Sequence, residues 1–155
     1  MTRLVALAIA LVACDHPTPA PPPPSTEIAP SQDVRGLVGT LQHEAAHRPK
    51  AGVTAEQLFD ALDAAGIKLA SRTQYVGATM QAAFCAGGRS GELVIAMCEY
   101  ASDHDADAGL AFMNARFGMP TATRRAHRGA VMTVVHQPGA DIAAVDRAFA
   151  TFQAL

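Results

Sequence analysis

The pattern of apolar and polar residues predicts four helices. Apolar side chains recur at helical spacing over residues 33–48, 55–65, 103–117 and 141–153. Thr54 and Gln57 form a capping box before the second helix, and Ser102 is placed to cap the third. The apolar positions expected to face the core are Val34, Leu37, Val38, Leu41 and Ala45, then Leu58, Leu62 and Ala65, then Ala106, Leu110, Met113 and Phe117, and finally Ile142, Val145, Phe149 and Phe152.

Strands are predicted between these helices, at residues 67–75, 84–86, 93–98, 123–127 and 130–136. The third is apolar at every position, so we expect it at the centre of the sheet with both faces covered. The glycine-rich residues 87–91 are expected to form a turn. Short strands joined by hairpins favour an α+β fold, a two-layer sandwich with helices on one face of a mostly antiparallel sheet. A parallel α/β fold is less favoured, because only residues 98–123 contain a crossover helix.

The first thirteen residues have the layout of a secretory signal. Arg3 precedes ten consecutive apolar residues, too few for a transmembrane helix, which needs about 20. Residues 11–14 read Leu-Val-Ala-Cys and resemble the lipobox of bacterial lipoproteins. The resemblance implies cleavage before Cys14 and acylation of its thiol with palmitate-like chains, which would anchor the protein stably in a membrane. The alternative is an ordinary secretory signal that happens to contain a cysteine.

Residues 14–32 are expected to form a tether between the lipidated cysteine and a single globular domain at residues 33–155. Seven of the ten prolines fall in this segment. Such a run adopts extended polyproline II and lacks the apolar content to pack, so it reaches up to ~50 Å. The predicted location is the bacterial cell envelope, with the domain outside the cytoplasm, either periplasmic or at the surface.

Charge argues against a nucleic-acid partner. The chain has 12 basic and 14 acidic residues, a formal charge of −2, and removal of Arg3 with the signal leaves 11 against 14, or −3. A nucleic-acid-binding domain carries a basic footprint, which this chain lacks.

Cys85 and Cys98 remain as an even pair once Cys14 is acylated. An even pair outside the cytoplasm favours a disulfide. For a loop of about 14 residues, such a bond adds roughly 3 kcal/mol to the free energy of unfolding. A tight hairpin at residues 87–91 would instead place Cys85 opposite Leu93, ~16 Å along the strand from the partner it needs. The bridge therefore requires a departure from that hairpin, and two buried free thiols are the alternative.

The segment His43-Glu44-Ala45-Ala46-His47 matches the H-E-x-x-H pattern of zinc metalloproteases. In that pattern two histidines one helical turn apart bind zinc, and the glutamate activates a bound water. The histidines lie opposite the predicted apolar stripe of their helix, and Val53 stands where a third histidine would follow. We therefore expect no metal and no cofactor. His43 and His47 stay as candidates for a surface metal site completed by His104 or a second molecule.

Two charged clusters have simpler explanations than ligand binding. Asp103, Asp105 and Asp107 suit the first turns of a helix, and the segment lacks the glycine and distant glutamate of a calcium loop. Positive charge gathers near the last hairpin and could meet an anionic headgroup, a polysaccharide or an acidic partner, or simply be solvated. Its residues are Arg116, Arg124, Arg125, His127 and Arg128.

These observations favour a membrane-anchored envelope lipoprotein with a binding domain that is not an enzyme. The expected partners are the membrane, through the anchor, and an envelope protein or cell-wall component. The alternatives are a zinc-dependent hydrolase that uses the segment at His43 to His47, and a spacer domain with no specific ligand.

Overall fold

The computed structural model describes residues 34–50 and 52–155, so the predicted signal peptide, Cys14 and the whole of the predicted tether lie outside it. The described elements follow the predicted order, with one added 3₁₀ helix, η1. They are α1 Val34–Ala46, α2 Ala55–Ala64, β1 Ala70–Tyr75, η1 Gly77–Met80, β2 Phe84–Ser90, β3 Leu93–Glu99, α3 Asp103–Arg116, β4 Ala122–His127, β5 Ala130–His136 and α4 Ile142–Gln153. None of these helices is long and apolar enough to cross a bilayer.

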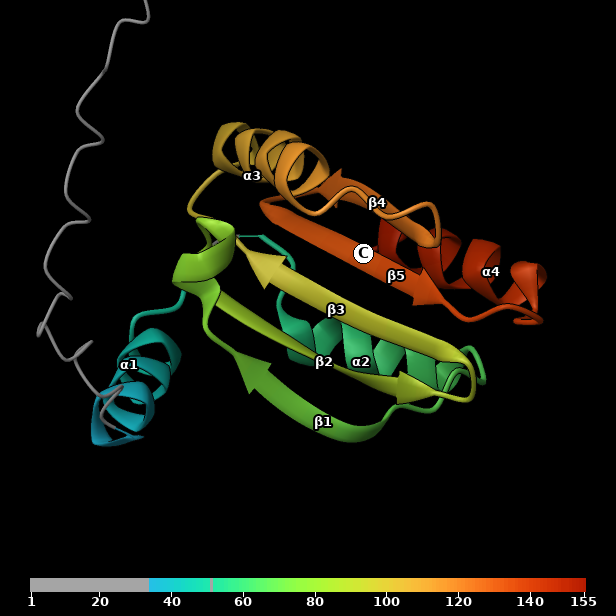
Figure 1. Cartoon of the computed structure of the whole chain (residues 1–155), viewed down its shortest axis with the longest axis horizontal. Helices are drawn as coiled ribbons and strands as arrows, with labels where there is room; N and C mark the ends of the chain where they lie inside the picture. The colour runs from blue at the N-terminus through green and yellow to red at the C-terminus, as the bar shows by residue number, and fades with distance from the viewer. Residues whose placement is uncertain (1–33, 51) are drawn as a thin grey trace, which may run out of the picture. The chain divides into compact units, whose positions relative to one another are not determined.

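The five strands form one antiparallel sheet in the order β1-β2-β3-β5-β4 (Figure 1). The predicted α+β class is therefore confirmed, and β3 occupies the centre as expected. The capping box at α2 is also present: the Thr54 hydroxyl accepts from the Gln57 N–H, and the Gln57 side chain accepts from the Thr54 N–H. At the other end of α2, Gly66 has a positive φ of 81°, as a residue that stops a helix often has.

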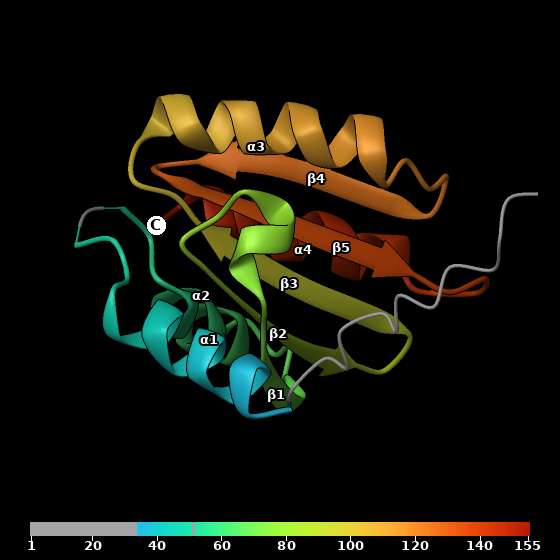
Figure 2. The ribbon, with the colours of Figure 1, turned by 60° about the vertical axis from the view of Figure 1, so that its left-hand side comes forward.

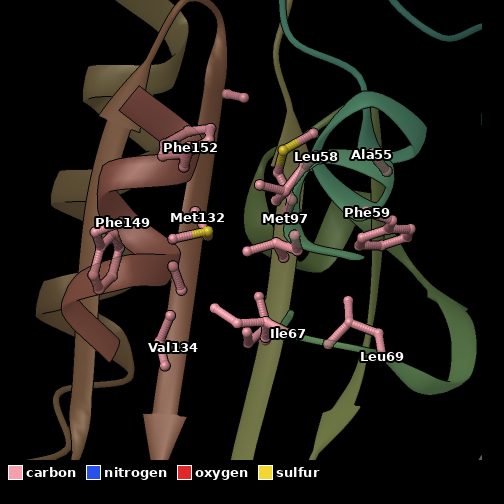
Figure 3. Packing of buried hydrophobic residues seen from close by; sticks show 14 of the residues in the cluster. Ala55, Leu58, Phe59, Ile67, Leu69, Met97, Met132, Val134, Phe149 and Phe152 are labelled. Atoms are coloured by element: carbon pink, nitrogen blue, oxygen red, sulfur yellow. The ribbon is translucent and has the colours of Figure 1, made fainter. Parts of the chain in front are cut away.

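The larger part of the core lies between the sheet and helices α2 and α4. Leu58 of α2 and Phe149 of α4 approach Met97 and Met132 on this face (Figure 3). The expectation that helices share one face holds for these two, whereas α3 lies on the opposite face and runs along β4 (Figure 2). Its buried Met113 belongs to a second cluster with Val131, Cys85 and Cys98. This second face is only partly covered, so the prediction that both faces of the central strand are buried was wrong for Val94 and Ala96.

The predicted core stripe of α1 was wrong. Leu37 is 51% exposed, Val38 is 47% exposed, and Ala45 is exposed as well. The helix is attached instead through polar contacts from another side, where the Gln74 side-chain amide donates to the Leu41 carbonyl at 2.8 Å. Three residues at other helix ends were also predicted to face the core but are exposed: Ala65, Phe117 and Ile142.

The glycine-rich segment is strand, not turn. β2 continues to Ser90, and the glycines are needed because neighbouring strands pass close to them. A Cβ at Gly87 would lie 2.4 Å from the Ile95 oxygen, and one at Gly88 would lie 2.9 Å from the Ala70 oxygen. Side chains at these positions would collide with backbone, so small residues here serve sheet packing.

The longer β2 removes the geometric objection to the disulfide. Cys85 lies directly opposite Cys98 in the β2–β3 register. Their sulfur atoms are 2.05 Å apart, which is the length of a disulfide bond. The disulfide predicted from the even number of remaining cysteines is therefore present, and it joins β2 to β3.

Candidate functional site

The two histidines of the H-E-x-x-H segment lie on the exposed side of α1. Their rings are stacked, with centroids 4.0 Å apart, and the His47 Nδ1–H donates to the His43 carbonyl at 2.8 Å. Among residues 34–50 and 52–155, no group of three or more histidine, cysteine or acidic side chains is placed to hold a metal ion. His104, the donor considered from sequence, is not brought into such a group. His43 and His47 could bind a metal only as a two-ligand surface pair.

Glu44 points away from both histidines and into the protein. Its side chain accepts hydrogen bonds from the backbone N–H groups of Gly77, at 2.8 Å, and Ala78, at 3.0 Å. Glu44 is only 8% exposed. These N–H groups open the 3₁₀ helix η1, where no partner within the helix exists for them, and an anion suits that end of a helix. The carboxylate that would activate water in a protease therefore connects α1 to η1.

A second buried carboxylate holds the end of α1 to the sheet. Glu99 on β3 is 2% exposed and accepts from the Ala55 N–H at 2.7 Å, at the start of α2. Arg48 donates to both oxygens of Glu99 and, at 2.7 and 2.6 Å, to both oxygens of Glu56. These bonds raise the pKa of Arg48, Glu56 contributing most, and the same contact lowers the pKa of Glu56. The group fixes the α1–α2 connection and leaves no carboxylate free for catalysis.

The acidic start of α3 is occupied by structural contacts. The Ser102 hydroxyl accepts from the Asp105 N–H and donates to the Asp105 carboxylate. Asp103 accepts from the Gly129 N–H at 2.5 Å and so fixes the β4–β5 turn. The helix-cap interpretation accounts for the Ser102–Asp105 contact, whereas the Asp103–Gly129 bond is a tertiary contact that the sequence analysis did not predict.

The basic residues near the last hairpin do not form one patch. Arg125 lies over the Phe149 ring on the α4 side of the sheet, with its guanidinium 4.8 Å from the ring centroid. Arg128 donates to the Leu155 backbone oxygen at the end of α4. Of these three arginines, Arg124 lines the partly covered side, and its guanidinium donates to the Phe117 carbonyl at 2.9 Å. The predicted basic surface is therefore divided between two faces.

The partly covered face of the sheet carries an apolar groove of about 260 Å³, which we call the open-face groove. Its floor follows one register row that joins Ala96, Thr133 and Arg124 on three neighbouring strands, and Cys85 extends the floor to β2. The side chains of Ala96 and Thr133 are small, so a hollow remains above them. Its walls come from Tyr75 of β1, Met80 of η1, Met113 of α3 and the segment after α3. The residues that line it are Tyr75, Met80, Cys85, Ala96, Cys98, Met113, Phe117, Met119, Arg124, Thr133 and Val135.

Large apolar side chains at the rim of this groove reach solvent. Tyr75, Phe117 and Met119 are all exposed, and they come from two separate parts of the chain, the end of β1 and the segment after α3. Scattered apolar residues on a surface are normal, but several that converge on one hollow are typical of a binding surface. The open-face groove is therefore the strongest candidate for a functional site in the described part of the chain.

Comparison with protein-family models, with curated proteins and with solved structures gives no match to this chain. Function must therefore be inferred from the geometry of the domain. The groove was not predicted from the sequence, because its floor depends on the order and register of four paired strands, which local sequence patterns do not reveal. One residue in the sequence indicates the hollow: Ala96 is small, within a strand whose neighbouring residues carry larger apolar side chains.

Proposed function

We propose that this chain is a bacterial envelope lipoprotein whose folded domain binds an apolar ligand in the open-face groove without catalysing a reaction. The lipobox-like residues 11–14 and the proline-rich residues 14–32 support the anchor and the tether. The Cys85–Cys98 disulfide is in keeping with a location outside the cytoplasm, where disulfides persist.

The open-face groove is the observation that carries the proposed binding. Water in contact with an apolar hollow is displaced favourably by an apolar ligand, by about 25 cal/mol for each Å² removed from water. Ligand sites are typically concave, mostly apolar and supplied with a few polar groups that orient the ligand. Thr133 and Arg124 provide such groups at one end of the floor.

A zinc-dependent hydrolase is not our proposal. The Glu44 carboxylate is engaged by two N–H groups of η1 and faces away from the histidine rings, so it is not placed to activate a water beside them. Purified full-length chain should contain no stoichiometric, chelator-sensitive zinc. One zinc per chain, removed by chelator together with a hydrolytic activity, would overturn the non-catalytic assignment.

The anchor is tested by metabolic labelling with an alkyne fatty acid in a bacterial host. The parent chain should carry the label and sediment with membranes. The Cys14→Ser variant should lose the label and leave the membrane fraction. Label retained by Cys14→Ser would show that acylation occurs at another residue and would refute the assignment of Cys14 as the anchor.

The groove is tested with Nile red, an uncharged dye whose emission shifts to the blue in apolar surroundings. We would use the full chain with Cys14→Ser, so that no acyl chain attached at Cys14 competes. Ala96→Phe places a large ring on the groove floor and should weaken dye binding at least tenfold. Ala150→Phe makes the same change on the exposed side of α4 and is the matched control. Equal binding by the two variants, with unchanged thermal unfolding, would refute the groove as the binding site.

A further inference from the structure

Arg124 is a partly buried cation at the end of an otherwise apolar groove. Among the described residues it forms no ion pair, whereas Arg48 and Arg147 each have a carboxylate partner. Removing a charge from water without a counter-charge is costly, and proteins normally pair such groups. Arg124 is therefore the place in the groove where a bound anion would gain most.

The guanidinium of Arg124 also has unused hydrogen-bonding capacity. Within residues 34–50 and 52–155, its five N–H groups meet two acceptors, the Phe117 carbonyl at 2.9 Å and the Asn114 side-chain oxygen at 3.4 Å. The buried Nε has no partner among the described residues. Burial also lowers the pKa of Arg124, which means that its charged form is less stable here than in water. A carboxylate at this end of the groove would supply both the missing acceptors and the counter-charge.

The rest of the floor suits an alkyl chain better than a peptide. From Arg124 on β4 across β5 and β3 to Cys85 on β2 the lining crosses three strand spacings, about 14 Å, which accommodates an alkyl chain of roughly ten to twelve carbons. Apart from Thr133, the floor between these two residues offers no side-chain hydrogen bond. A peptide laid along it would bury backbone N–H and C=O groups without partners, and an alkyl chain has none to lose.

We propose that the open-face groove binds a free fatty acid, with the alkyl chain over Thr133, Ala96 and Cys85 and the carboxylate against Arg124. This inference rests on the proposed function of the groove as an apolar binding site and adds the class of ligand. It also assigns Arg124 as the residue that selects an anionic headgroup over a neutral one.

The test compares decanoate with decanol, which has the same chain length but no charge, as competitors for Nile red on the full chain carrying Cys14→Ser. Decanoate should compete at least tenfold more strongly than decanol. Arg124→Met should abolish this preference while keeping dye binding, and Arg124→Lys should keep part of it. Arg147→Met, on the surface of α4, removes a charge elsewhere and should change nothing. A purely structural role for Arg124 would alter stability or dye binding but not the ratio of acid to alcohol.

The outcomes separate this inference from the proposed function. Nile red binding with equal competition by decanoate and decanol would overturn the fatty-acid proposal and leave the groove as an apolar site. Absence of dye binding would overturn both. Sedimentation that shows a dimer, dissociated by Ala96→Phe, would assign the groove to a second copy of the chain and also refute the fatty-acid proposal.

Discussion

Replacement of Glu44 by alanine distinguishes a structural glutamate from a catalytic one. The substitution leaves the η1 N–H groups of Gly77 and Ala78 without their carboxylate acceptor. A hydrogen bond to a charged group contributes about 1.5–3 kcal/mol, and the bond to Gly77 is buried. Because water can partly replace the acceptor at the less buried Ala78, we expect a total loss of about 2–4 kcal/mol. Glu44→Gln keeps one acceptor oxygen and should lose roughly half as much.

Urea unfolding followed by circular dichroism measures this loss directly. For a domain of this size a loss of about 3 kcal/mol corresponds to a fall in Tm on the order of 10 °C. His43→Ala and His47→Ala are the matched controls, since they alter the same helix at exposed positions. Each should change the free energy of unfolding by less than about 0.5 kcal/mol.

The zinc hypothesis predicts the opposite pattern from these variants. If the histidines held a metal, each histidine variant would be destabilised and a chelator would lower the Tm of the parent chain. Glu44→Ala would then reduce activity with little effect on folding. A stable Glu44→Ala protein beside unstable, chelator-sensitive histidine variants would refute the structural role assigned to Glu44.

Three further changes test other parts of the fold. Serine in place of both Cys85 and Cys98 should lower the free energy of unfolding by roughly 3 kcal/mol, and adding reductant to the parent chain should reproduce that loss in the same denaturation assay. Gly109→Ala should cost about 1–3 kcal/mol in urea unfolding, because the new Cβ would lie 2.3 Å from the buried Tyr100 ring; a neutral effect would contradict this packing. Burial raises the pKa of Tyr100 to about 12, so in Tyr75→Phe, where Tyr100 is the sole tyrosine, absorbance titration should give a midpoint near pH 12. Since the folded-state pKa is raised, the stability linked to Tyr100 is present below pH ~10 and is lost as the pH rises toward 12; ionisation near pH 10 in the folded protein would contradict the burial.

The sequence predicts the order of elements well because local signals agree with the fold. The capping box at Thr54, the apolar run at residues 93–98 of β3 and the positive φ of Gly129 between β4 and β5 are each local features of a few residues. The glycine-rich part of β2 was misread for a physical reason. Glycine is favoured both where a turn needs a positive φ and where two backbones approach closely, and the sequence does not separate these two uses.

The face of α1 was misread because its attachment is polar. Periodicity assumes that the apolar side of a helix is the buried side. Here Glu44 and Arg48 reach inward and bond to η1 and β3, and Leu37 and Val38 are left in solvent. The partners that make Glu44 and Arg48 structural lie 33 and 51 residues away, so no local pattern could reveal them.

The same reversal explains why the motif in α1 misleads and why the groove was overlooked. A buried carboxylate in an H-E-x-x-H segment suggests chemistry when only its neighbours in sequence are known, yet both oxygens of Glu44 are occupied by backbone N–H groups. Arg124, in contrast, sits in a run of basic residues that suggests a solvated hairpin, yet it is the member of that run placed in an apolar hollow without a counter-charge among the described residues. What separates the two residues is how far the described part of the fold satisfies each charged side chain. Two N–H groups engage both oxygens of Glu44, which makes that residue structural. Arg124 meets two neutral acceptors but no carboxylate among the described residues, and the proposed fatty acid would supply that counter-charge.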